Sequence, residues 1–173
     1  MWFCRLTFAL LALALFSGCG FQPLYGGRLG GSVLADLSSI ELGPLEGVIG
    51  VQLQNTLQDN LQLNNRKAKA HTLALTYDTA SYPMITARDS QISRYTMILT
   101  VHYKLFEVSS GSMVMAGHTS AHASYNVISD NVYATFVAEE EASLRAAKQI
   151  GSQIASVLSL HFAREKQLSR VGR

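Results

Sequence analysis

Apolar side chains recur with two different periods along this chain, and each period predicts one kind of element. From Tyr95 to Leu105 apolar and polar residues alternate, which predicts a half-buried antiparallel strand. Between residues 45 and 63 the apolar positions instead recur every four residues, which predicts an amphipathic helix. The apolar residues of this helix are Ile49, Leu53, Leu57 and Leu61.

Weaker patterns complete the predicted order of elements. Short strands are predicted over 37–42 and from Thr72 toward Pro83, which ends or edges its strand, and residues 84–93 connect to the next strand. A hairpin turn at 109–112 leads to a return strand over 113–127. A long helix follows from Asn131 to about residue 162, capped by Ser129 or Asp130 and weakened at Gly151.

The order is therefore β-α-β-β-β-α, and the predicted class is α+β. Each helix has one apolar stripe and the sheet has one apolar face. We expect a four-stranded, mainly antiparallel sheet with both helices packed on one face. The other face is then only partly covered.

The N-terminus follows a different pattern. Arg5 precedes an apolar run from Leu6 to Phe16, which is shorter than the roughly 20 residues that cross a bilayer. We interpret residues 1–18 as a signal peptide rather than as a buried helix, because the run has no polar face. Of the two cysteines, Cys4 would leave with this segment and Cys19 would become the first mature residue.

Cys19 carries the anchor hypothesis. The segment 15–19 resembles a bacterial lipobox, with Phe16 where leucine is usual. The resemblance implies a diacylglycerol and an N-acyl chain on Cys19, which together make a stable membrane anchor. Gly20 stands where aspartate would retain an enteric lipoprotein at the inner membrane, so the expected location is the outer membrane.

Composition divides the rest of the chain and excludes some functions. Residues 19–32 are rich in glycine and predict a flexible tether, 33–163 form one domain, and 164–173 form a basic polar tail. The 14 basic and 12 acidic side chains nearly balance. That balance argues against a nucleic-acid partner.

The sequence offers no catalytic constellation, and we expect no enzyme activity, no metal and no cofactor beyond the lipid. His118 and His122 have a spacing that suits zinc on a helix, but on a strand they are about 13 Å apart. The polar face of the 45–63 helix consists mostly of amides. Those amides either face solvent or pack against a polar protein surface.

At this point the residues carry a family resemblance. The segment 19–26, Cys-Gly-Phe-Gln-Pro-Leu-Tyr-Gly, resembles the mature start of the LptE family of lipopolysaccharide-assembly lipoproteins. Gly111, the 117–125 strand, Tyr133 and the helix after Ala138 follow that family's order. The resemblance implies an LptE-like fold. It also implies a non-catalytic plug in the lumen of an LptD-type outer-membrane β-barrel, forming a heterodimer that contacts lipopolysaccharide in transit and helps the barrel assemble.

A lipid A phosphate needs cations, which guanidinium groups supply bidentately. The candidates are Arg88 in the connection, and Arg94 and Lys104 on the uncovered face. They can equally be ordinary surface charges. Two other functions stay open: a structural lipoprotein that tethers a different envelope complex, and a small lipid-anchored enzyme.

Overall fold

The computed structural model of this protein describes residues 28–63, 68–85, 92–128 and 130–171. Predictions made for Cys19, Arg88 and Ser129 fall outside the described residues and stay predictions. The contacts and cavities discussed below lie in the compact unit Ser32–Arg173.

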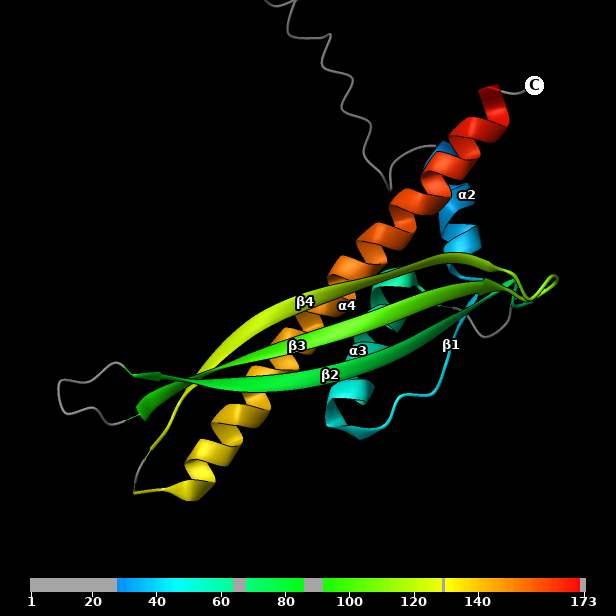
Figure 1. Ribbon diagram of the computed structural model, residues 1–173. Coiled ribbons are helices and arrows are strands. Elements are labelled where there is room, and N and C mark those ends of the chain that lie inside the picture. The colour runs from blue at the N-terminus through cyan, green and yellow to red at the C-terminus, as the bar shows by residue number, and fades with distance from the viewer. Residues whose placement is uncertain (1–27, 64–67, 86–91, 129, 172–173) are drawn as a thin grey trace, which may run out of the picture. The chain divides into compact units, whose positions relative to one another are not determined.

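Three helices and four strands follow one another along the described chain (Figure 1). In order they are α2 (Arg28–Leu37), β1 (Ile40–Leu42), α3 (Gly47–Leu61), β2 (His71–Ile85), β3 (Ile92–Glu107), β4 (Met113–Asn126) and α4 (Val132–Val171).

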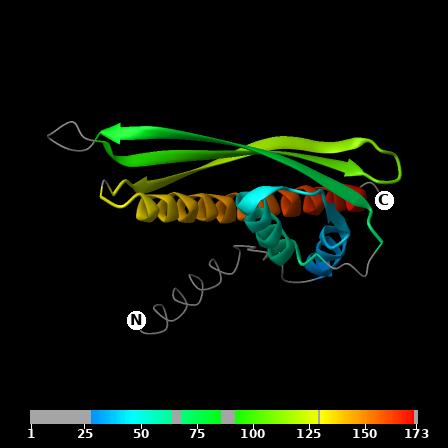
Figure 2. The ribbon, with the colours of Figure 1, turned by 90° about the horizontal axis from the view of Figure 1, so that it is seen from below.

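The four strands form one sheet in the order β1-β2-β3-β4. β1 runs parallel to β2 from the pair Ile40↔His71 to the pair Leu42↔Leu73, and the other neighbours are antiparallel. Helices α3 and α4 pack on the same face of this sheet (Figure 2). The predicted α+β fold with a mainly antiparallel sheet and two helices on one face is therefore confirmed.

The core lies between that sheet face and the two helices. Alternation along β3 buries every second side chain, as predicted, and α3 and α4 each contribute a stripe of fully buried aliphatic residues. Each such side chain contributes roughly 1.5–3 kcal/mol relative to exposure, which fixes the register of the strands against the helices. The buried residues are Met97, Leu99, Val101, Tyr103 and Leu105 of β3, Leu53, Leu57 and Leu61 of α3, and Ile150, Ile154 and Leu158 of α4.

Helix α2 was not predicted. The tether was expected over 19–32 and a strand from Leu37, but the chain is helical over Arg28–Leu37 and β1 begins only at Ile40. Gly30 and Gly31 disfavour a helix locally. Val33 and Leu37 are buried in the core, so tertiary packing outweighs that low propensity.

Helix α4 also differs from the prediction at both ends. Its N-cap is Asn131, whose Oδ1 accepts a hydrogen bond from the Ala134 amide at 2.9 Å, rather than Asp130. At the other end the helix continues to Val171, although 164–173 was expected to be a tail. Lys166 Nζ lies 2.6 Å from Asp36 Oδ2 of α2, which holds this extension against the domain.

Two glycines permit close approach inside the unit. A Cβ on Gly151 of α4 would lie 2.8 Å from Thr56 Cγ2 of α3. A Cβ on Gly117 of β4 would lie 2.6 Å from Tyr103 Cζ. Gly151, predicted as a weak point of the helix, is therefore a position of close approach between α3 and α4.

Among the helices within the described ranges, none combines the length and the apolar character that crossing a membrane requires.

Candidate ligand-binding site

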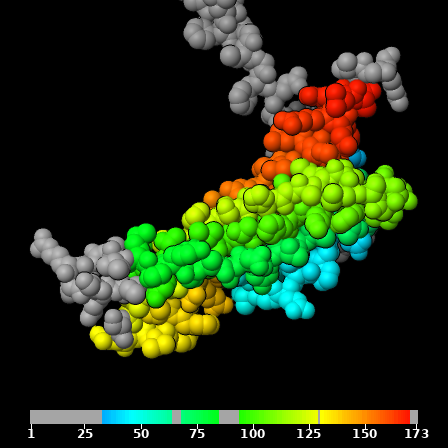
Figure 3. Space-filling view, viewed as in Figure 1, coloured from blue at the N-terminus to red at the C-terminus, as the bar shows by residue number. Residues whose placement is uncertain are grey.

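The sheet has one face that α3 and α4 leave open, formed by β2, β3 and β4 (Figure 3). The outward residues of these strands are mostly small or hydroxylated, with cations and histidines among them. Arg94, His102 and Lys104 of β3 are exposed on this face, as are His118 and His122 of β4. The strand placement of His118 and His122 is as predicted.

A cavity of about 320 Å³ opens at the end of this sheet, where β4 leads into α4. It is lined by one residue of β3, three of β4, one of the connection and three of α4. These are Arg94, Ser124, Tyr125, Asn126, Ile128, Ala138, Glu141 and Arg145.

Two guanidinium groups supply the charge of this cavity. Arg145 lies 3.7 Å from the Glu141 carboxylate and donates to the Ser124 carbonyl oxygen at 3.4 Å. Arg94 is exposed, and none of the ion pairs found among the described residues involves it. The lining therefore holds two guanidinium groups and one carboxylate, and its formal charge is positive.

Tyr125 lines the cavity, and Tyr95 is its register partner on the neighbouring strand β3. The rings of Tyr95 and Tyr125 stack with centroids 5.8 Å apart at an interplanar angle of 13°. Burial, and after it the negative charge of Glu139, raises the pKa of Tyr125. The phenol therefore stays neutral at physiological pH and presents an aromatic wall with a polar tip.

An exposed apolar patch borders the cavity. It consists of Ile128, Val132, Tyr133 and Phe136, whose exposed fractions run from 47% to 82%. Ile128 belongs to both the cavity and the patch. Its backbone amide donates a hydrogen bond to Thr135 Oγ1 in the first turn of α4 at 2.9 Å. Exposed apolar surface of this kind marks contact with a partner or with lipid.

The structure separates the cations predicted from sequence. Arg94 lies in the cavity, whereas Lys104 is at the opposite end of β3, about 33 Å away. Arg88 lies outside the described residues. Arg145, which sequence reasoning missed, is 51 positions from Arg94 in the numbering, and no local pattern brings the two together.

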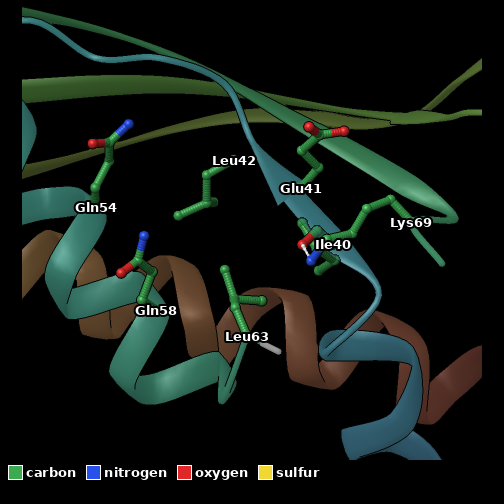
Figure 4. A pocket seen from close by; sticks show the side chains of 7 residues that line it. All are labelled: Ile40, Glu41, Leu42, Gln54, Gln58, Leu63 and Lys69. Carbon is green, nitrogen blue, oxygen red and sulfur yellow. Dashed lines mark hydrogen bonds between the residues drawn. The ribbon is translucent and has the colours of Figure 1, made fainter. Parts of the chain in front are cut away.

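A second, polar cavity of about 260 Å³ lies between β1 and α3 (Figure 4). Its side chains bind the backbone of β1 and of the residue that follows. Lys69 Nζ donates to the Ile40 carbonyl oxygen at 3.1 Å, and Gln54 Nε2 donates to the Gly43 carbonyl oxygen at 3.0 Å. β1 is the edge of the sheet, so these bonds protect carbonyls that could otherwise pair with another chain.

The sequence left open whether the amides of this helix face solvent or pack against a polar protein surface. At Gln54 the amide face of α3 packs against the protein's own backbone. Gln58 of the same face is exposed. The polar cavity therefore contains side chains that protect the edge strand, and the arginine cavity is the candidate for ligand binding.

Metal-binding clusters of three or more histidine, cysteine, aspartate or glutamate side chains do not occur among the described residues.

Comparisons with known proteins agree with the fold. The chain is 27% identical over 159 residues to an uncharacterized protein of Rickettsia prowazekii, covering 91% of this chain and 98% of that protein. The crystal structure of a candidate lipoprotein from Caulobacter crescentus superposes with a TM-score of 0.64 at 24% identity, covering 77% of this chain and 97% of the other. A minor lipoprotein of Acinetobacter baumannii superposes with a TM-score of 0.52 at 18% identity, covering 70% and 88%.

These two structural likenesses concern the fold alone. The sequence model of the lipopolysaccharide-assembly family LptE matches residues 37–158, which is most of the chain and includes β1 to β4, α3 and the larger part of α4. The chain belongs to the LptE family of lipopolysaccharide-assembly proteins.

Proposed function

We propose that this protein is an outer-membrane lipoprotein, acylated on Cys19, that works with an LptD-type β-barrel in moving lipopolysaccharide to the outer leaflet. In this role it plugs the barrel and assists its assembly, and it makes or breaks no covalent bond. The family match supports the pathway. The observation that supports lipopolysaccharide as the ligand is the pair Arg94 and Arg145 beside an exposed apolar patch.

The chemistry of the cavity fits a phosphorylated amphiphile. Guanidinium groups pair with phosphate oxygens through two parallel hydrogen bonds, and Arg94 and Arg145 line one cavity. The adjoining patch with Val132 and Phe136 offers apolar surface for acyl chains. Lipid A combines both groups in one molecule, so a single site of this composition can contact each of them.

The anchor is proposed from the sequence around Cys19 and from the related structures that are described as lipoproteins. Two or more acyl chains give a stable membrane anchor, because each buried methylene contributes about 0.8 kcal/mol. Replacing Cys19→Ser is expected to release the exported chain from membranes. Mass analysis of the wild-type chain is expected to find an acylated N-terminus that begins at Cys19.

Lipopolysaccharide binding by the full-length chain in detergent tests the ligand part of this proposal. Arg94→Glu and Arg145→Glu should each weaken binding by at least about tenfold, since a hydrogen bond to a charged group is worth about 1.5–3 kcal/mol. Lys104→Glu is the matched control, because it makes a comparable charge reversal on the same strand outside the cavity. If all three variants lose affinity for lipopolysaccharide equally, the loss reflects net charge rather than this cavity. If the two arginine variants keep their affinity, the cavity is not the lipopolysaccharide site.

A different function would follow from a different partner. A structural lipoprotein that tethers another envelope complex would carry the same anchor at Cys19 but would retain that complex, without the barrel, during purification. Turnover of any envelope substrate would contradict the non-catalytic role.

A further inference from the structure

Two histidines lie directly opposite each other on the open face of the sheet. His102 of β3 and His118 of β4 are register partners, both are exposed, and their ring centroids are 5.7 Å apart at a tilt of 39°. The spacing of His118 and His122 along one strand separates that pair by about 13 Å. The antiparallel hairpin instead supplies His118 with a neighbour from the other strand.

The separation of the two rings matches that of two imidazoles bound to one metal ion. A zinc–nitrogen bond is about 2.0–2.1 Å, which places the ion about 3.2 Å from each ring centroid. Two such rings have centroids about 5.2 Å apart at a tetrahedral angle and about 6.4 Å apart when they are opposed. The observed 5.7 Å lies between these limits, so the two rings are at a separation at which one nitrogen of each can bind a shared ion.

The neighbours of the pair determine which ions fit. Thr76 lies opposite His102 on the other side, in the same row across the sheet. His122 lies opposite Ile98, four positions along β4 from His118. No third histidine or carboxylate joins the pair in the described part of the chain. Two imidazoles select borderline ions such as Zn²⁺, Ni²⁺ and Cu²⁺ over Mg²⁺ and Ca²⁺, which prefer oxygen ligands.

We propose that His102 and His118 form a two-histidine site for a borderline divalent ion on the open face of the sheet. Each imidazole supplies one nitrogen, and water or an anionic oxygen fills the remaining positions of the ion. The site is independent of the arginine cavity, which is at the end of β3 that holds Arg94. Its existence therefore does not depend on the proposed function.

Zinc titration by calorimetry tests the site, using the full-length chain in detergent, purified through a tag that contains no histidine. His102→Gln and His118→Gln are each expected to weaken Zn²⁺ binding by at least about tenfold. His122→Gln is the matched control on the same strand and face, and it should leave the affinity unchanged. Since all variants share the rest of the chain, Cys4 and Cys19 included, their differences isolate the imidazole pair.

A spectroscopic measurement complements the titration. Electron paramagnetic resonance of one bound Cu²⁺ should show coupling to two imidazole nitrogens in the wild-type chain and to fewer in His102→Gln. Circular dichroism should be unchanged, because both side chains are exposed. The proposal is overturned if the wild-type chain binds no Zn²⁺, or if His102→Gln and His118→Gln bind Zn²⁺ as tightly as the wild-type chain does. It is also overturned if His122→Gln weakens Zn²⁺ binding as much as these two variants do.

Discussion

Replacing Gly151→Ala sets two effects of opposite sign against each other. Alanine is favoured over glycine in a helix interior by about 1 kcal/mol, so helix propensity alone predicts a more stable protein. The new Cβ, however, would lie 2.8 Å from Thr56 Cγ2 and 2.9 Å from Thr56 Cβ. Both distances are well below van der Waals contact, so one of the two helices must shift.

Thr56 cannot easily move aside. It is β-branched and almost fully buried, which restricts its side chain to one or two rotamers in a helix. Its hydroxyl also donates to the Gln52 carbonyl oxygen at 2.8 Å, and rotation would break that bond. Overpacking of this kind costs about 1–3 kcal/mol, which outweighs the gain in propensity. We expect a net loss of roughly 1 kcal/mol in the free energy of unfolding, or a fall of about 2–4 °C in Tm.

Urea denaturation followed by circular dichroism measures this change. Gln149→Ala is the matched control, because Gln149 is exposed on the same helix and should change stability by less than about 0.5 kcal/mol. Thr56→Ser removes Cγ2 and keeps the hydroxyl, so combining it with Gly151→Ala should cost less than the sum of the two. Stabilisation of Gly151→Ala by about 1 kcal/mol would refute the close-contact argument.

Three further predictions concern other contacts. Gly117→Val should destabilise the sheet by about 1–3 kcal/mol in the same assay, because the side chain would overlap the Tyr103 ring; an unchanged midpoint would contradict this. Tyr125 has a raised pKa, so its stabilising contribution is present below the ordinary tyrosine pKa and is lost as pH rises toward the folded-state value. The absorbance difference between wild type and Tyr125→Phe should show ionisation above the ordinary value, and ionisation at or below it would exclude the effect. Lys166→Ala should lower the free energy of unfolding by about 0.2–1 kcal/mol, because it breaks the ion pair with Asp36. This loss should be smaller at high salt, and a loss that does not depend on salt would indicate packing instead.

Periodic segments could be predicted because their pattern and their burial have the same cause. The alternation around Leu99 in β3 and the four-residue repeat around Leu57 in α3 each identify one buried face. Helix α2 could not be predicted, because Gly30 and Gly31 oppose a helix locally. It is the burial of residues such as Leu37 against distant parts of the chain that favours it.

The candidate sites depend on register and on tertiary packing. Phe106 pairs with Met113, and continuing that register without the bulge after Leu105 would place Gly117 opposite His102. The bulge shifts the pairing by one residue, so that His118 becomes the partner, and such a shift exchanges the two faces of a strand. The sequence shows a turn here but not the bulge.

The arginine cavity was only half predicted, and for a related reason. Arg94 could be assigned to a strand and to its open face from alternation alone. Arg145 joins it because of where α4 crosses the end of β4, which depends on the packing of the whole helix rather than on local pattern.

The role of a lipid-anchored partner for a β-barrel is tested most directly by purifying the mature protein from outer membranes in mild detergent and identifying its companions by mass. We expect one abundant companion, an LptD-type barrel, in roughly equal amount to the lipoprotein. The Lys104→Glu variant should retain this companion. Recovery of the lipoprotein alone, or with an unrelated envelope complex in place of the barrel, would contradict this role.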